Sequence, residues 1–219
     1  MKAIIFDLDQ TLIDRTKTVR KYLNGQYDRF ATELSCSQDA FTTSVMRTQK
    51  NGYADKLTAY EESMEELGQS VEAEVLLTDF KATYGLDGEL YPNIKEMLAK
   101  VSERYVLGMV TNGRTNTQNA KIDSAGIREF FKVIKVSETE GVSKPNEEIY
   151  LRCLADLGLS AEECVFVGDH PVSDIAGPKS LGMKTVWIRS EHYEEPEAAD
   201  LVIDSASELV ERLDSEIFR

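Results

Sequence analysis

Short apolar segments alternate with amphipathic segments from Tyr91 onward, and this alternation restricts the fold of the chain more than any other feature. The short segments predict strands, and the amphipathic segments predict helices. The predicted strands are 105–110, 132–136, 164–167, 184–188 and 201–203, and the predicted helices are 93–102, 116–125, 146–157, 172–181 and a last one after residue 203. Such an order is typical of a parallel sheet that helices cover on both faces.

The first strand of this sheet lies near the start of the chain. Residues 3–6 form an apolar run, whereas residues 15–85 have helical periodicity and no convincing strand. We therefore expect a doubly wound, Rossmann-like α/β core made of residues 1–14 and 86–219, with an all-helical cap domain inserted at residues 15–85. The turn-prone sequence Gly-Leu-Asp-Gly at 85–88 is the expected point of return to the core.

Composition and charge exclude several classes of partner. The chain has 219 residues, of which 42% are hydrophobic, so it can bury a proper core. Its formal net charge of −14 would repel a nucleic-acid polymer. No apolar run reaches the roughly 20 residues that cross a bilayer, and no leader sequence follows Met1. We expect a cytoplasmic monomer or small homo-oligomer with no membrane partner.

Two acids stand where the first strand is expected to end. Asp7 and Asp9 follow the apolar run directly, and beyond a strand end the chain can curl so that both side chains point to one centre. Two carboxylates this close repel one another unless a cation or a shared proton relieves them. The pair therefore indicates a metal ion, a division into acid and base, or both. A solvated acidic turn is the alternative.

Three later segments place further polar residues at strand ends or before a helix. Thr111 and Asn112 end a strand and can donate hydrogen bonds to phosphoryl oxygens, although Thr-Asn-Gly is also an ordinary turn. Lys144 precedes a predicted helix, whose start favours anions, although a lysine in this place is often solvated. Asp169 and Asp174 follow a buried strand and a glycine that permits close backbone approach.

The acids at these strand ends offer enough oxygen ligands for a hard cation. Mg²⁺ prefers oxygen ligands in near-octahedral geometry and keeps several waters, so a few carboxylate or carbonyl groups and a phosphate oxygen complete its site. A transition metal is less favoured, because His170 and His192 are the only histidines and neither has a partner at ligand spacing. The sequence therefore predicts a magnesium site. His170 lies in the loop of the last of these segments, where it either contacts a ligand or faces solvent, and a place in solvent is favoured.

In this order, the four segments resemble the motifs of the haloacid dehalogenase (HAD) superfamily of phosphohydrolases. The residues that carry the resemblance are Asp7-Leu8-Asp9-Gln10-Thr11, Thr111, Lys144, and Gly168-Asp169 with Asp174, and it extends from Lys2 to about Ile188. The insertion resembles the alpha-helical (C1-type) cap of one subgroup. The Thr-Asn-Gly and Lys-Pro-Asn sequences resemble its nucleotidase-like or sialic-acid-phosphatase-like branch. The chain departs from the family pattern at Gln10, where glycine is frequent, and at Pro178 and Leu181, where smaller residues are common.

The resemblance implies a phosphatase that hydrolyses a small anionic phosphate monoester. Asp7 would be the nucleophile that forms an aspartyl-phosphate, and Asp9 would protonate the leaving alcohol and then activate water. Three other functions stay open: a phosphomutase of a sugar phosphate, a 2-haloacid dehalogenase, and a binding protein that has lost turnover. The dehalogenase is disfavoured, because its reaction has no leaving alcohol for Asp9 to protonate.

The resemblance also implies roles for the other site residues. The phosphoryl oxygens would be held by Thr111, the backbone of Asn112, and Lys144. The Mg²⁺ cofactor would be held by the side chains of Asp7 and Asp169 and by the backbone carbonyl of Asp9. Asp174 would orient Lys144 or a metal-bound water.

Basic residues are concentrated at the start of the insertion. Between Arg15 and Lys56, eight basic residues stand against four acidic ones. This excess indicates either a solvated helix face or a means of attracting an anionic small molecule. The residues with which the insertion would select a substrate are Arg15, Lys17, Arg47, Lys50, Asn51, Tyr53 and Lys56.

Overall fold

A computed structural model of the chain describes residues 1–52, 54–212 and 217. The chain divides into two compact units, a core unit of residues 1–14 and 89–219 and a helical unit of residues 15–88. The chain leaves the core unit after Asp14 and returns to it at Glu89. These two residues are neighbours in space, since the backbone N–H of Asp14 donates a hydrogen bond to the carbonyl of Glu89 (2.8 Å). The helical unit is therefore an insertion into one loop of the core unit.

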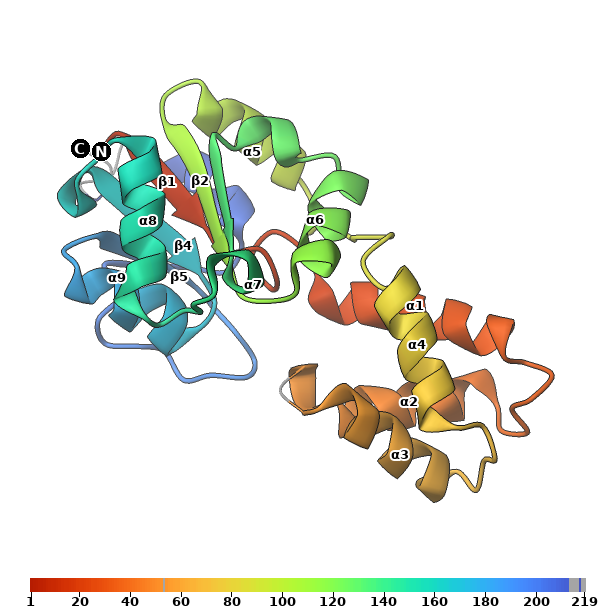
Figure 1. Ribbon diagram of the computed structural model, residues 1–219. Helices are drawn as coiled ribbons and strands as arrows, with labels where there is room; N and C mark the ends of the chain where they lie inside the picture. The colour runs from red at the N-terminus through yellow and green to blue at the C-terminus, as the bar shows by residue number, and fades with distance from the viewer. Residues whose placement is uncertain (53, 213–216, 218–219) are drawn as a thin grey trace. The chain divides into compact units, whose positions relative to one another are not determined.

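Six parallel strands form one sheet in the order β3-β2-β1-β4-β5-β6 (Figure 1). The strands are β1 (Ala3–Phe6), β2 (Val106–Thr111), β3 (Val133–Val136), β4 (Cys164–Gly168), β5 (Lys184–Ile188) and β6 (Leu201–Ile203). Phe6 of β1 pairs with Met109 of β2 and with Val167 of β4. The predicted doubly wound parallel sheet is confirmed. Because the winding reverses at β1, ligands are expected at the carboxyl ends of β1 and its neighbours.

Helices and short turns connect these strands. They are α5 (Ile94–Ser102), α6 (Thr115–Ser124), η2 (Arg128–Phe130), α7 (Ser137–Glu140), α8 (Glu147–Leu157), η3 (Ala161–Glu163), the π-helical turn η4 (Pro171–Ala176), α9 (Gly177–Ser180), η5 (Ala206–Glu208) and α10 (Leu209–Arg212). The helix predicted over 172–181 is found as one uninterrupted helical segment, which begins as the π-helical η4 and continues as α9. The wider turn of η4 lets the Asp174 carboxylate return to the backbone N–H of His170 (3.0 Å).

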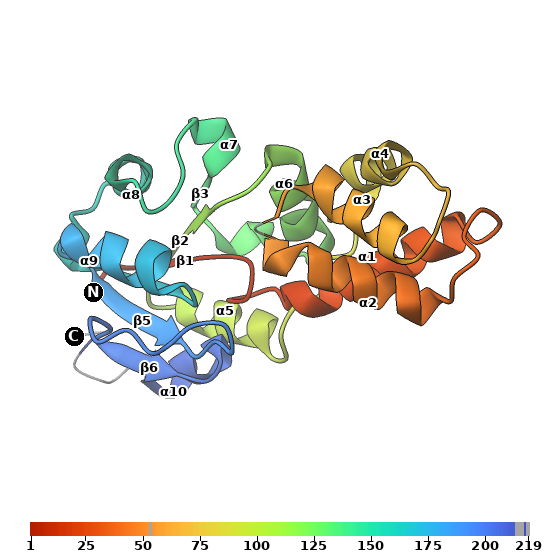
Figure 2. The same ribbon diagram turned by 90° about the horizontal axis from the view of Figure 1, so that it is seen from below.

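Both faces of the sheet are covered, because successive side chains of a strand point to opposite faces. Ile4 and Phe6 of β1 pack in one apolar cluster with residues of α5, α6 and α10. Ala3 and Ile5 pack in a second cluster with residues of α8. Figures 1 and 2 show these helices on the two sides of the sheet.

The helical unit has an apolar core of its own. Its helices are α1 (Arg15–Arg29), α2 (Gln38–Thr48), the short η1 (Lys50–Gly52), α3 (Lys56–Glu66) and α4 (Ala73–Thr83). Tyr22, Phe41 and Tyr60 are large members of the core. The buried Gln26 amide lies among them, donating to the Leu76 carbonyl (2.9 Å) and accepting from the Tyr60 hydroxyl (2.8 Å). In the described part of the chain, none of the helices combines the length and apolar character that crossing a bilayer requires.

Candidate active site

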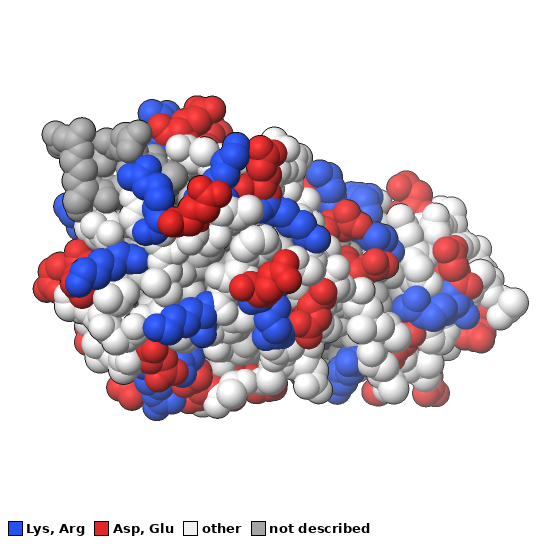
Figure 3. Space-filling model, turned by 90° about the horizontal axis from the view of Figure 1, so that it is seen from above, with Lys and Arg blue, Asp and Glu red and all other residues white. Residues whose placement is uncertain are grey.

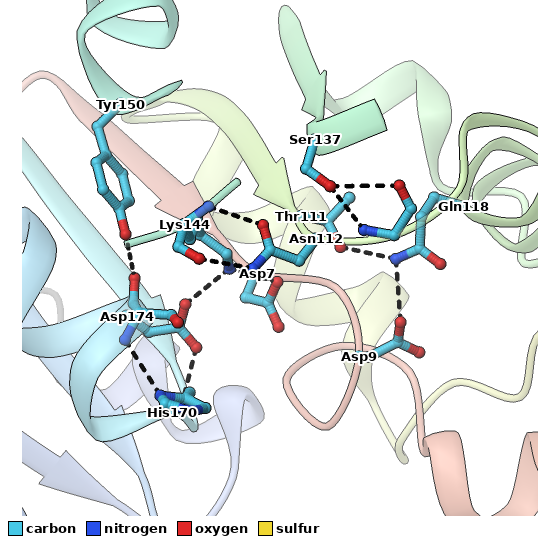
Figure 4. A network of polar contacts seen from close by, with 12 residues as sticks. Asp7, Asp9, Thr111, Asn112, Gln118, Ser137, Lys144, Tyr150, His170 and Asp174 are labelled. Atoms are coloured by element: carbon cyan, nitrogen blue, oxygen red, sulfur yellow. Dashed lines mark hydrogen bonds and ion pairs between the residues drawn. The ribbon is translucent and has the colours of Figure 1, made fainter. Parts of the chain in front are cut away.

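Polar side chains meet at the carboxyl ends of the three central strands. Asp7 follows β1, Thr111 ends β2, and Asp169 follows β4. All three are buried, as are Lys144 and Asp174. Figure 4 shows Asp7 beside Lys144, with Asp174 on the other side of the lysine. The structure thus brings together five of the residues that the sequence singled out.

Lys144 lies between two of the carboxylates. Its ammonium donates hydrogen bonds to Asp7 Oδ1 and to Asp174 Oδ1, both at 2.7 Å. Burial opposes the charge on the ammonium, but the carboxylates of Asp174 and Asp7 outweigh this effect and raise the pKa of Lys144. If Asp174 orients Lys144, the two side chains must be in contact, and this hydrogen bond is such a contact. That role itself stays a prediction.

Three acids in this group lie close enough to share a metal ion. Asp7, Asp169 and Asp174 each place one carboxylate oxygen within 4.8 Å of the other two. Burial, together with the charges of Asp174 and Asp7, raises the pKa of the Asp169 carboxyl to about 8. Burial also raises the pKa of Asp7 to about 7, although Lys144 opposes the shift. Three carboxylates therefore face a single ammonium, and a divalent cation would balance the remaining charge.

The loop after β4 is packed closely around Asp174. A Cβ atom at position 168 would lie 2.4 Å from Asp174 Oδ2, so only glycine leaves room for this carboxylate. The His170 ring, which was expected to face solvent, is exposed only in part. It lies at the start of η4, where Nδ1 accepts from the backbone N–H groups of Val172 and Ser173 (3.1 Å each). His170 therefore shapes the turn that carries Asp174.

Trp187 connects the same loop to β5. Its buried indole N–H donates to the backbone carbonyl of Asp169 (2.7 Å). Trp187 is the single tryptophan of the chain. Its fluorescence therefore reports on the position of the Asp169 loop.

Asn112 ties the end of β2 to the segment that carries Lys144. Its side chain donates to the Lys144 carbonyl (3.0 Å) and accepts from the Lys144 backbone N–H (2.9 Å). These two bonds engage the amide group, so the phosphate-binding role expected of Asn112 concerns its backbone alone. That role is not tested by these contacts and stays a prediction.

The Asp9 carboxylate is held by a different set of residues. Lys121 of α6 donates to both of its oxygens (2.8 Å each). Gln118 donates from Nε2 to Asp9 Oδ2 (3.0 Å) and to Thr111 Oγ1 (2.7 Å). In Figure 4 the Asp9 side chain points toward Gln118. The Asp9 side chain is therefore separate from the cluster of three acids, and the backbone metal contact expected of Asp9 stays a prediction.

Several basic residues of the insertion form ion pairs within the helical unit. The ion pairs join Arg29 to Asp79, Arg47 to Glu66, and Lys21 to Asp87. Arg15 lies against Gly52 and donates to the Gln49 side chain (3.4 Å). These contacts favour the structural interpretation of the basic stretch for these residues, and Figure 3 shows basic and acidic side chains mixed on one face. Tyr53 lies outside the described residues.

A sequence profile of the family described as haloacid dehalogenase-like hydrolase matches residues 4–188, a range that contains all of these site residues. The chain belongs to the haloacid dehalogenase-like hydrolase family. This HAD-like hydrolase is 30% identical to the glyceraldehyde 3-phosphate phosphatase of Methanocaldococcus jannaschii, over 96% of this chain and 96% of that protein. It is 28% identical to the N-acylneuraminate-9-phosphatase of Rattus norvegicus, over 86% of this chain and 82% of that protein.

Solved structures agree with the fold of this HAD-like hydrolase. The HAD-hydrolase YfnB from Bacillus subtilis superposes with a TM-score of 0.81 at 22% identity, over 97% of this chain and 98% of that chain. At this identity the likeness shows the fold alone. The family profile and the relatives above confirm the family resemblance and the branch that the sequence indicated.

Sequence analysis of this HAD-like hydrolase missed Lys121 and Gln118. Both lie on a helix that was expected, and their spacing of three residues puts them on one face of it. That spacing is the signal that the sequence offers. It is weak, because polar residues at the same spacing also occur on ordinary solvated helix faces.

Proposed function

We propose that this HAD-like hydrolase is a magnesium-dependent phosphatase that hydrolyses a small-molecule phosphate monoester through an aspartyl-phosphate on Asp7. The observation that carries the proposal is the buried Asp7 carboxylate at the centre of the sheet edge, 2.7 Å from the Lys144 ammonium. A carboxylate can attack phosphorus, and the ammonium balances the charge of the phosphoryl group. Relatives named as phosphatases of small phosphate esters support the substrate class.

The reaction has two steps at phosphorus. In the first, an Asp7 oxygen attacks phosphorus, the bond from phosphorus to the ester oxygen breaks, and Asp9 gives its proton to the leaving alcohol. In the second, Asp9 takes a proton from water, the water oxygen attacks phosphorus, and the bond to Asp7 breaks. The products are an alcohol and inorganic phosphate, and both aspartates return to their starting states.

The acidic cluster fits a bound magnesium ion. The carboxylates of Asp7 and Asp169, together with the backbone carbonyl of Asp9, would hold it, with Asp174 close to the same centre. All are oxygen ligands, as Mg²⁺ prefers. The ion, when bound, lowers the repulsion between the carboxylate nucleophile and the anionic phosphate. Two carboxyls with raised pKa values support this assignment, because a nearby cation favours their ionised forms.

Residues 1–14 and 86–219 act in this proposal as the catalytic core, and the helical insertion acts as a cap that selects the substrate. In the sequence, the insertion begins six residues after Asp9, the predicted proton donor. Its Lys50 is exposed and has a positive φ of 46° within η1. A positively charged, exposed turn suits a substrate with a second anionic group.

Two other reactions of the same site give different products. A phosphomutase would return the phosphoryl group to a sugar and release little inorganic phosphate. A 2-haloacid dehalogenase would release halide. Assays of free phosphate, isomerised sugar phosphate and halide therefore separate the three reactions.

The test is a panel of phosphate esters assayed with Mg²⁺ and with a chelator. We expect phosphate release with Mg²⁺, loss under chelation, and a loss of at least about 10³-fold in Asp7→Asn, because this variant lacks the nucleophile. Asp156→Asn, an exposed carboxylate on α8, is the matched control and should keep full activity. Mg²⁺ binding is followed separately through Trp187 fluorescence. Activity that persists in Asp7→Asn, or that is indifferent to the chelator, contradicts the proposal.

A further inference from the structure

A buried ion pair outside the acidic cluster holds the Asp9 carboxylate. The Lys121 side chain is 2% exposed, and that of Asp9 is 20% exposed. The ammonium donates to both Asp9 oxygens (2.8 Å each) and to Gln118 Oε1 (3.1 Å). An ammonium has three N–H groups, so these three acceptors satisfy it. Removing either residue of the pair would leave the charge of the other without a partner. An unpaired charge in a buried place destabilises the folded state.

Lys121 also determines which way the Gln118 amide faces. An ammonium only donates hydrogen bonds, so the amide atom beside it must be the oxygen. The amide nitrogen then faces the other way, where it donates to Asp9 Oδ2 (3.0 Å) and Thr111 Oγ1 (2.7 Å). Gly113 leaves space for this arrangement, since a Cβ atom there would lie 2.9 Å from Gln118 Cγ and Cδ, and its φ is +149°.

The direction of these hydrogen bonds affects Thr111. Its Oγ1 accepts a hydrogen bond from the amide nitrogen of Gln118. The hydroxyl hydrogen of Thr111 is therefore available to donate to another acceptor. A phosphoryl oxygen is such an acceptor. One buried lysine therefore orients two groups at once, the Asp9 carboxylate directly and the Thr111 hydroxyl through Gln118.

We propose that Lys121 is a positioning residue, which holds Asp9 in the orientation for proton transfer and, through Gln118, turns the Thr111 hydroxyl toward the phosphoryl group. This inference rests on the proposed phosphatase function. Lys121 acts on the reaction through Asp9 and, by way of Gln118, through Thr111. Its loss should therefore harm most those substrates whose leaving group needs a proton from Asp9.

The test compares an alkyl phosphate with p-nitrophenyl phosphate, whose leaving group departs without a proton. In Lys121→Met we expect kcat/KM to fall about 100-fold for the alkyl ester and less than about 10-fold for the nitrophenyl ester, because general acid catalysis contributes factors of this size. Lys121→Arg, which keeps the charge, should recover most of the loss. Lys132→Met, at an exposed lysine, is the matched control and should behave as the wild type.

A double variant tests whether Lys121 acts through Asp9. In the Asp9→Asn background, only the route through Gln118 and Thr111 remains, so Lys121→Met should lower kcat/KM for the alkyl ester by less than about tenfold. The double variant also removes both charges of the pair, so it should melt at a higher temperature than Lys121→Met alone. An equal loss of kcat/KM for both esters in Lys121→Met overturns this inference. The inference is also overturned if Lys121→Met lowers kcat/KM for the alkyl ester as much in the Asp9→Asn background as in the wild type. If the wild type releases no phosphate from any ester, the proposed function fails instead.

Discussion

Gly168 shows how closely single residues of the site are matched to one another. The position carries no side chain because the Asp174 carboxylate occupies the space in which a Cβ would lie. Asp174 in turn holds Lys144, and Lys144 holds Asp7. A change at a residue with no chemistry of its own therefore reaches the predicted nucleophile through two ion pairs.

Gly168→Ala should destabilise the protein and lower its activity. The added methyl group must displace Asp174, so we expect a loss of about 2 kcal/mol in the free energy of unfolding, typical of overpacking, and about a 100-fold loss in kcat. Gly25→Ala is the control, because it lies inside α1 and meets only the Arg29 side chain, at 3.4 Å. That variant should gain up to about 1 kcal/mol. Denaturant unfolding and phosphate release measure both effects, and a fully active Gly168→Ala would contradict the role given to Asp174.

At the scale of secondary structure elements, strands were easier to predict than the contacts between elements. The strands expected at 105–110 and 164–167 are found as β2 and β4, shifted or extended by one residue. Buried parallel strands are continuous apolar runs, which the chain shows plainly. The acids and the threonine at their ends were predicted for the same reason, since parallel strands bring their carboxyl ends to one edge.

Features that depend on contacts between distant segments could not be predicted in this way. The π-helical turn η4 depends on His170, Asp174 and the space at Gly168, none of which has a local signal for that geometry. Lys121 is another example. Its sequence neighbours indicate an ordinary helix, and the partner that explains its burial is Asp9, 112 residues away in the chain.

At the scale of the whole molecule, the acidic cluster links stability to pH and to metal binding. Burial and neighbouring charges raise the pKa of Asp169 from 3.8 to about 8 in the folded, metal-free protein. A carboxyl whose pKa is higher in the folded than in the unfolded state binds its proton more tightly when folded. The fold therefore loses stability from this group as the pH rises from about 4 to about 8.

Asp169→Asn should remove this dependence. In the presence of a chelator, we expect the variant to gain stability relative to the wild type between pH 5 and pH 8, by about 4 kcal/mol. Mg²⁺ at pH 8 should raise the melting temperature of the wild type more than that of the variant. Thermal melts across this pH range measure both differences, with Asp156→Asn as the exposed control. If the difference in stability between Asp169→Asn and the wild type stays constant with pH, Asp169 is not the group that makes stability depend on pH.

Transfer of the phosphoryl group to Asp7 is the central step of the proposed reaction. In Asp9→Asn, p-nitrophenyl phosphate can still phosphorylate Asp7, whereas water is no longer activated, so the aspartyl-phosphate should accumulate. The measurement is acid quenching, borohydride reduction and mass spectrometry of the peptide that contains residue 7. We predict a burst of about one nitrophenolate per chain, with residue 7 converted to homoserine. Release of nitrophenolate with residue 7 unchanged would contradict the account.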